Sequence, residues 1–293
     1  MKPPLFVLLF LGMSACYQTS QPTLEKHSDN MSSNVCPCSN SDYLAQSILW
    51  YQRSPEMRAL YLQSYHLAKV SLAYQVKHKK HPKKKNAIVV DIDETILNNS
   101  PYQAWLYLHN QVFSDSGWNA WVQEAKAEPL PGTVDFLNYA KGLGCEIFYI
   151  SNRKKDPLFA ATLSNLKKFD LPYSDSTHLL LKTPSDTTAS GKTTKEKRRR
   201  KIEQELNCEI LLLCGDQLAD FDKAFDVQKG GTDKQILDSI TLYRAQFGHR
   251  FIVLPNPMYG DWLAALVNGS NKDFQCSHLD SLRKKAVLDW KKR

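Results

Sequence analysis

Five short apolar runs, rich in Leu, Ile and Val, constrain the fold of this chain more than any other feature. They lie at 87–92, 145–150, 178–181, 209–214 and 250–254. Continuous apolar runs of this length are typical of parallel strands that are buried on both faces. Helix-like segments between them would supply the crossovers that join parallel strands, at 134–141, 157–169 and 195–206. We therefore predict an α/β fold with a doubly wound parallel sheet.

Two further helical regions flank the first of these runs. Apolar residues recur at helical spacing over 41–80, with a break at Ser54-Pro55, and the segment 98–130 is mostly helical in pattern and rich in aromatic residues. An insert directly after the first strand overhangs the carboxyl edge of the sheet, where ligands of such folds bind. The predicted parts are a mostly helical cap at 41–80 and 98–130, an α/β core at 86–97 and 131–270, and a C-terminal helix at 271–293.

The first residues are typical of an export signal. Lys2 precedes an apolar run over 5–11, which is too short to span a bilayer, and Ser14-Ala15 leads to Cys16. A cysteine in this place indicates a bacterial lipoprotein signal over 1–16, with Cys16 carrying the lipid. Ordinary export and an uncleaved signal anchor are the alternatives.

A polar tether follows the signal. Residues 17–40 contain few large apolar groups and predict a disordered segment before the domain at 41–293. The protein would then be exported and held on the bacterial cell envelope by its lipid. Because Tyr17 rather than an aspartate follows Cys16, we expect the outer membrane.

Positive charge is concentrated in two parts of the chain. The formal net charge is +8, and the runs at 78–85 and 195–201 hold much of it. Such runs are usually solvated faces, and they would also attract anionic substrates. No aromatic residues interleave with either run, which disfavours dedicated nucleic-acid binding.

Acidic side chains follow two of the predicted strands. Asp91 and Asp93 come after the first, and Asp216 and Asp220 after the fourth. The carboxyl ends of parallel strands meet at one edge of the sheet, so these acids would repel one another unless a cation neutralised them. Ligation by oxygen alone favours Mg²⁺. A cap or loop role is the alternative for any single acid, but four at matched strand ends favour a metal site.

Groups suited to an anion follow the second and third strands. Ser151-Asn152-Arg153 offers a hydroxyl, an amide and a guanidinium where a phosphate would lie, with capping as the alternative role. Lys182, Lys192 and Lys195 follow the third strand. One of these lysines would neutralise the charge on a transferring phosphoryl group.

These motifs resemble, in order, those of haloacid dehalogenase-type phosphatases. The matching stretches are DIDET at 91–95, SNR at 151–153, a lysine after the third strand and GDQLAD at 215–220. Stretches at 99–102, 148–153 and 251–260 further resemble the class C acid phosphatases, which include bacterial outer-membrane lipoproteins that dephosphorylate nucleotides. The resemblance covers about 41–293 and implies a haloacid dehalogenase-like, Rossmannoid core.

The resemblance implies a role for each matching acid. Asp91 would attack phosphorus and form an aspartyl-phosphate, while Asp93 would protonate the leaving group and then activate water. Mg²⁺ would be held by Asp91, the backbone carbonyl of Asp93 and Asp216. Asp220 would support the outer shell of the metal.

The resemblance also implies the groups that hold the phosphoryl oxygens, which are Ser151 and a lysine. We choose Lys195 because its spacing before a basic helix matches the family better than that of Lys182. The loop at 183–191 leaves Lys182 and Lys192 open as alternatives.

Four further residues are predicted to contact the substrate. Asn152 and Arg153 lie in the second motif, and Trp118 and Tyr259 align with aromatic positions that sandwich a nucleobase in related enzymes. Ordinary aromatic packing is the alternative for Trp118 and Tyr259.

We therefore predict a Mg²⁺-dependent acid phosphomonoesterase that acts on small phosphomonoesters, in particular nucleoside 5′-monophosphates. A surface lipoprotein that binds a ligand or host component without turnover is the alternative, and sugar phosphates or phosphoproteins are alternative substrates. The membrane would be contacted through the lipid, and no nucleic-acid partner is expected. The oligomeric state stays open, with a homodimer among the alternatives.

Overall fold

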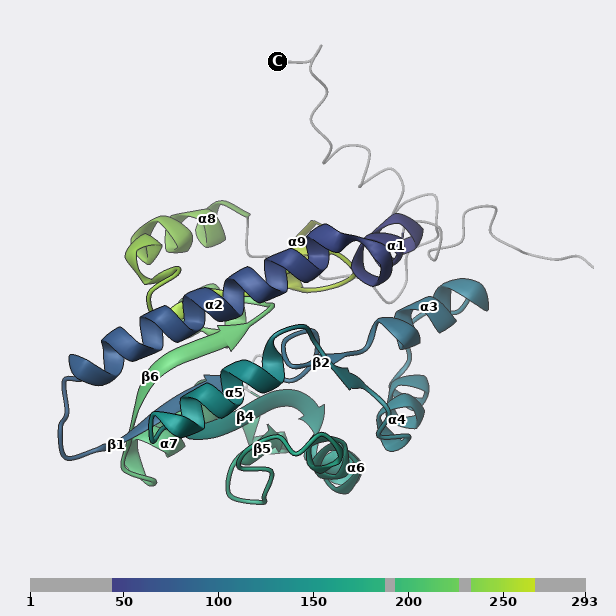
Figure 1. Cartoon of the computed structure of the whole chain (residues 1–293). Helices are drawn as coiled ribbons and strands as arrows, with labels where there is room; N and C mark the ends of the chain where they lie inside the picture. The colour runs from purple at the N-terminus through teal and green to yellow at the C-terminus, as the bar shows by residue number, and fades with distance from the viewer. Residues whose placement is uncertain (1–43, 188–192, 227–232, 267–293) are drawn as a thin grey trace, which may run out of the picture. The chain divides into compact units, whose positions relative to one another are not determined.

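Five strands form one parallel sheet in the order β5-β4-β1-β6-β7 (Figure 1). Their bounds are Lys85–Val90 for β1, Glu146–Lys154 for β4, Leu179–Lys182 for β5, Cys208–Gly215 for β6 and Phe251–Val253 for β7. The chain adds β4 and β5 on one side of β1 and then crosses to add β6 and β7 on the other. This reversal beside β1 is where open α/β sheets bind ligands. The predicted doubly wound fold is confirmed.

The computed structural model describes residues 44–187, 193–226 and 233–266, which belong to one unit, Cys36–Arg293. The predicted signal with Cys16, the tether at 17–40 and the helix at 271–293 lie outside the described residues and stay predictions. Within the described ranges, no helix combines the length and the hydropathy that a membrane crossing requires.

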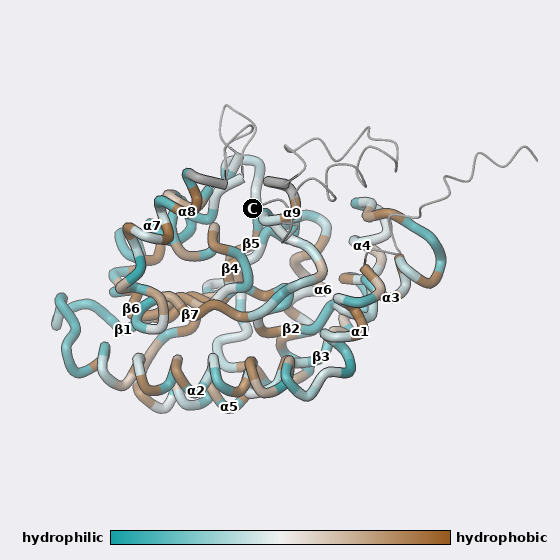
Figure 2. The backbone as a smooth tube through the Cα atoms, turned by 90° about the horizontal axis from the view of Figure 1, so that it is seen from above, coloured by the Kyte–Doolittle hydropathy of each residue, from teal (hydrophilic) through white to brown (hydrophobic). Residues whose placement is uncertain are grey.

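Helices cover both faces of the sheet because side chains on a strand point to alternate faces. In β1, Ile88 and Val90 join one buried cluster, and Ala87 and Val89 join the other. The first cluster is covered by α2 (Pro55–Lys77), α5 (Thr133–Gly142) and α6 (Lys155–Lys168), and the second by α7 (Glu196–Gln204) and α8 (Asp233–Leu242). Figure 2 shows the hydrophobic strands β6 and β7 between α2 and α5 on one side and α7 and α8 on the other.

The helix pair predicted over 41–80 is present, but only part of it belongs to the cap. The first helix, α1 (Ala45–Arg53), packs against α3 (Ser100–Leu108) of the insert. Ser54 separates the pair, and its hydroxyl caps α2. The assignment of the whole segment to the cap is wrong for α2, because the buried side of this helix faces the sheet and α5.

The insert after β1 forms the predicted, mostly helical cap beyond the carboxyl ends of the strands (Figure 1). It contains α3 and α4 (Asp115–Gln123). A short antiparallel ribbon of β2 (Leu97–Asn98) and β3 (Glu128–Pro129) closes its base. Because of this ribbon, the cap begins and ends beside the loop that follows β1.

Two tyrosines of α2 hold the loop that follows β1. Tyr61 donates a hydrogen bond to the carbonyl of Glu94, at 2.5 Å, and Tyr65 donates to the carbonyl of Thr95, at 2.6 Å. Both tyrosine side chains are buried. A helix on the face of the sheet therefore fixes backbone atoms of the DIDET motif.

We expect Tyr65→Phe to lower the free energy of unfolding by about 1–3 kcal/mol, because the buried carbonyl of Thr95 would lose its donor. Urea unfolding followed by circular dichroism measures this. Tyr74→Phe is the matched control: Tyr74 lies on the same helix but is 53% exposed, so its change should stay within about 0.5 kcal/mol. Equal effects of the two changes would contradict a role of the Tyr65 hydroxyl.

Candidate active site

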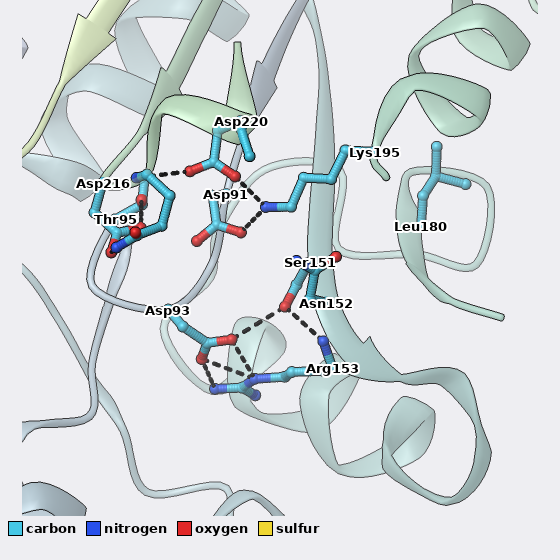
Figure 3. Close-up of polar contacts among 12 residues, drawn as sticks. Asp91, Asp93, Thr95, Ser151, Asn152, Arg153, Leu180, Lys195, Asp216 and Asp220 are labelled. Carbon is cyan, nitrogen blue, oxygen red and sulfur yellow. Dashed lines mark hydrogen bonds and ion pairs between the residues drawn. The ribbon is translucent and has the colours of Figure 1, made fainter. Parts of the chain in front are cut away.

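The predicted site residues meet at one edge of the sheet because of the strand register. At the end of β1, Val90 pairs with Tyr149 of β4 and with Cys214 of β6. The motifs that follow β1 and β6 therefore begin at nearly the same level as the motif at 151–153, which lies in the last residues of β4. The structure brings Asp91, Ser151 and Asp216 to this edge (Figure 3).

Three carboxylates cluster together, and one lysine contacts two of them. Oxygens of Asp91, Asp216 and Asp220 lie within 4.8 Å of one another. The amine of Lys195 contacts Asp91 Oδ1 and lies 2.6 Å from Asp220 Oδ1 (Figure 3). Asp91, Asp220 and Lys195 are buried, so these charges act on one another with little screening by water.

The shifted pKa values of these groups show that negative charges lie close together in the cluster. Burial raises the pKa of Asp91 well above its usual range, against the opposing effect of Lys195. Burial, with the charge of Asp220, raises the pKa of Asp216 to about 7. Burial alone would lower the pKa of Lys195, but Asp220 and Asp91 together raise it. One ammonium group does not balance three carboxylates.

A divalent cation fits this donor set. The carboxylates offer hard oxygen ligands from three residues at one place, and a cation would relieve the repulsion that raises their pKa values. Asp91 and Asp216 are the predicted ligands. Asp220, predicted in a supporting role, bonds both Lys195 and the backbone N–H of Gln217.

Asp93 faces away from this cluster, toward β4 (Figure 3). Its carboxylate accepts hydrogen bonds from Arg153, from Asn99 and, at 3.0 Å, from the hydroxyl of Ser151. This placement is compatible with the prediction that only the backbone carbonyl of Asp93 faces a metal. Ser151 is fully buried and accepts a hydrogen bond from the backbone N–H of Arg153.

The two residues that follow Ser151 differ in exposure: Asn152 is exposed, and Arg153 is buried. The Asn152 side chain accepts a hydrogen bond from Arg198 at 3.1 Å. The guanidinium of Arg153 is buried and forms an ion pair with Asp93. Arg153 is thus directed at protein partners, whereas Asn152 is exposed and its contact with a substrate stays a prediction.

Among the described residues, the lysine amine in contact with the carboxylates is that of Lys195, and its predicted contact with a phosphoryl group stays a prediction. Lys182 ends β5 beside Lys154 of β4, and Lys192 lies outside the described residues. Lys195 is the N-cap residue of α7. Two buried arginines of this helix hold the helix in position. Arg198 donates to the carbonyl of Ser151 at 2.6 Å, and Arg199 donates to that of Asp220 at 2.8 Å.

The prediction that the run at 195–201 is a solvated face is therefore wrong in part. Lys195, Arg198 and Arg199 are buried, whereas Arg200 is exposed. The signal that could have shown this is their spacing, because residues at i, i+3 and i+4 share one face of a helix.

Asp216 is held by amides that sequence reasoning did not assign. Asn256 Nδ2 donates to Asp216 Oδ2 at 2.8 Å, and Gln217 Nε2 donates to the same oxygen at 2.6 Å. Gln217 also accepts from the backbone N–H of Asp261, which ties the start of α9 (Asp261–Leu266) to the residue next to the predicted metal ligand Asp216. A side chain at Gly260 would overlap Gln217, so this close approach requires glycine.

The two aromatic residues predicted to stack on a base lie on different elements. Trp118 is half-buried on α4, edge-on to Tyr102 and with its ring over the guanidinium of Arg153. Tyr259 is half-buried in the loop after β7 and packs against the core. Base stacking between them stays a prediction.

The geometry agrees with a comparison against families of known proteins. The model of the HAD superfamily, subfamily IIIB (acid phosphatase), matches residues 11–262. The chain belongs to this family. The predicted superfamily and class are thereby confirmed, and the predicted enzyme class, a phosphoric monoester hydrolase, is that of the acid phosphatase family.

Solved structures of the family superpose on most of the chain. The class C acid phosphatase from Bacillus anthracis matches with a TM-score of 0.76 and 38% sequence identity, over 85% of this chain and 98% of that one. The same enzyme with tungstate bound matches with a TM-score of 0.77 and 36% identity, over 86% and 100% of the two chains. The likeness to class C acid phosphatases thus extends over most of the chain.

Two plant proteins are similar to part of the chain. The stem 28 kDa glycoprotein of Glycine max is 34% identical over 48% of this chain and 53% of its own length. Acid phosphatase 1 of Solanum lycopersicum is 26% identical over 58% of this chain and 57% of its own length. The chain thus spans about half the length of the curated relatives it matches.

We expect Mg²⁺ to raise the melting temperature more at pH 8 than at pH 5. Folding raises the pKa of Asp216 from 3.8 to about 7, so the stability that its proton contributes is complete below about pH 4 and is lost as pH rises through about 7. The metal-free protein should accordingly lose stability over this range, and a cation should restore it where the carboxylate is ionised. Differential scanning fluorimetry with Mg²⁺ or EDTA measures this. A larger shift at pH 5 would contradict it.

We expect Gly215→Ala to weaken Mg²⁺ binding by about 10–100-fold, because a Cβ on Gly215 would overlap the side chain of Asp220 and displace it from Lys195. Isothermal titration calorimetry measures the affinity. Gly142→Ala is the matched control, since a Cβ there meets nothing within 4 Å. Unchanged affinity in Gly215→Ala would show that Asp220 does not support the metal.

Proposed function

We propose that this protein hydrolyses small phosphomonoesters with the help of Mg²⁺, in two phosphoryl transfers through Asp91. The observation that carries this proposal is the buried contact of Asp91 with Lys195 inside a cluster of carboxylates. A carboxylate held beside a cation, at the carboxyl end of the central strand, suits attack on an anionic phosphate. Membership of the acid phosphatase family supports the same chemistry.

In the first transfer, Asp91 attacks phosphorus and the ester oxygen leaves. Lys195 orients the Asp91 carboxylate and stays close enough to neutralise a phosphoryl oxygen. Ser151 would offer its hydroxyl to a second phosphoryl oxygen. Mg²⁺, held by Asp91, Asp216 and the carbonyl of Asp93, would supply the remaining positive charge that phosphoryl transfer requires.

In the second transfer, water releases phosphate from Asp91. Asp93 protonates the leaving oxygen in the first transfer and takes a proton from this water in the second. Support for both roles comes from its contact with Ser151, the residue that would hold a phosphoryl oxygen. Splitting one displacement into two lowers each barrier.

Nucleoside 5′-monophosphates are the substrates we propose. Two half-buried aromatic side chains support this proposal. Trp118 lies on α4 of the cap, and Tyr259 lies in the loop after β7. Stacking on such side chains tolerates many bases. The tungstate bound to the Bacillus anthracis relative is a tetrahedral oxyanion of the same shape as phosphate, which supports a phosphate site in this family.

We expect the purified protein to release phosphate from nucleoside monophosphates with Mg²⁺ and to lose this activity in EDTA. Sugar phosphates and p-nitrophenyl phosphate run beside them, and Asp91→Asn should lose the activity on every substrate, by about a thousandfold or more. A malachite green assay of free phosphate measures this.

The possible outcomes separate the parts of this proposal. Release without nucleotide preference would keep the mechanism and remove Trp118 and Tyr259 as a base-binding pair. No release from any substrate would refute the proposed hydrolysis and favour a lipoprotein that binds without turnover.

A further inference from the structure

The nitrogens of the Arg153 guanidinium all form hydrogen bonds with other groups of the protein. Its Nη2 donates to Asp93 Oδ1 at 2.7 Å and its Nε donates to the same oxygen at 2.9 Å. Its Nη1 donates to Thr162 Oγ1 at 3.2 Å. The side chain is 1% exposed. Each nitrogen thus has a protein oxygen as its partner, so the group serves Asp93 rather than a substrate.

Asn99 is a second fixed donor to the same oxygen. Its Nδ2 lies 2.9 Å from Asp93 Oδ1, and its Oδ1 accepts from the indole of Trp121 at 2.8 Å. An indole N–H can only donate, so the oxygen of the Asn99 amide must face Trp121 and the NH₂ group must face Asp93. The indole therefore sets the orientation of the amide.

The two oxygens of Asp93 consequently differ. Oδ1 accepts from three N–H groups of Arg153 and Asn99, and none of these groups can accept a hydrogen bond in return. Oδ2 has Ser151 Oγ at 3.0 Å and only a long contact of 3.3 Å with Arg153 Nε. A hydroxyl can donate or accept, so a proton on Asp93 is compatible with Oδ2 and not with Oδ1.

We propose that Arg153, with Asn99, is a positioning residue that makes Oδ2 the oxygen of Asp93 that transfers protons. This inference rests on the proposed function. In the first step the Asp91–phosphorus bond forms, the ester bond breaks and the Oδ2 proton moves to the leaving oxygen, which gives the alcohol. In the second step the oxygen of water bonds to phosphorus, its proton moves to Oδ2, and Asp91 leaves as a carboxylate.

The cap contributes to this arrangement through one face of α4. Trp121 holds Asn99, and Trp118, one turn earlier, lies 5.7 Å from the guanidinium of Arg153. Both contacts come from a helix of the insert, whereas Arg153 and Asp93 belong to the core. The cap therefore takes part in the placement of the proton donor.

The test uses leaving groups that differ in their need for a proton. A p-nitrophenolate leaves without protonation, whereas an alkoxide requires it. We expect Arg153→Lys, which keeps the charge but not the planar fork, to lower kcat/KM for an alkyl phosphate by about 100-fold or more and that for p-nitrophenyl phosphate by about tenfold or less. Trp121→Phe, which removes the indole donor together with part of the ring, should show the same selectivity with smaller losses.

Controls separate this inference from the proposed function. Arg200→Lys makes the same change at an exposed arginine paired with Glu196, and it should leave both rates unchanged. Equal losses on the two esters in Arg153→Lys and Trp121→Phe, or no loss in either, would overturn the positioning role while hydrolysis by the wild-type protein still supports the function. If Arg153→Lys does not fold, the losses of Trp121→Phe on the two esters alone test the positioning role. A wild-type protein inactive on both esters would overturn both proposals.

Discussion

The mutual repulsion of buried carboxylates is the constraint on which the rest of this structure depends. Asp91, Asp216 and Asp220 would move apart in water, yet the fold holds them within 4.8 Å of one another. Lys195 offsets part of the repulsion. The remainder has to be resisted by the scaffold, which explains why so many buried polar contacts converge on the ends of β1 and β6.

The helices and loops around the site each oppose part of this repulsion between the carboxylates. Helix α2 fixes the loop after β1 through tyrosine hydroxyls, and α7 holds the end of β4 and the segment after β6 through Arg198 and Arg199. The loop after β7 supports Asp216 through Asn256. The acids therefore keep their positions because elements from both faces of the sheet are anchored to backbone atoms around them.

The sequence predicts the parallel sheet and the acids at its edge, because uninterrupted apolar runs and strand-end motifs are local patterns. It does not predict which side chains form hydrogen bonds or ion pairs with other groups of the protein. Arg153 is read as a substrate ligand because a guanidinium suits phosphate, whereas its bond to Asp93 joins positions far apart in the chain. The position of α2 on the sheet is missed for a similar reason: helical spacing shows that one side is buried but does not say against what.

The two tryptophans of α4 have a consequence for the exchange of caps between related enzymes. A cap is usually regarded as a module that can be swapped to change the substrate while the core keeps its chemistry. Here Trp121 bonds the residue that orients Asp93, and Trp118 covers Arg153. A foreign cap grafted between β2 and β3 would have to reproduce both Asn99 and this indole pair, or Asp93 in the hybrid protein would lose these fixed partners.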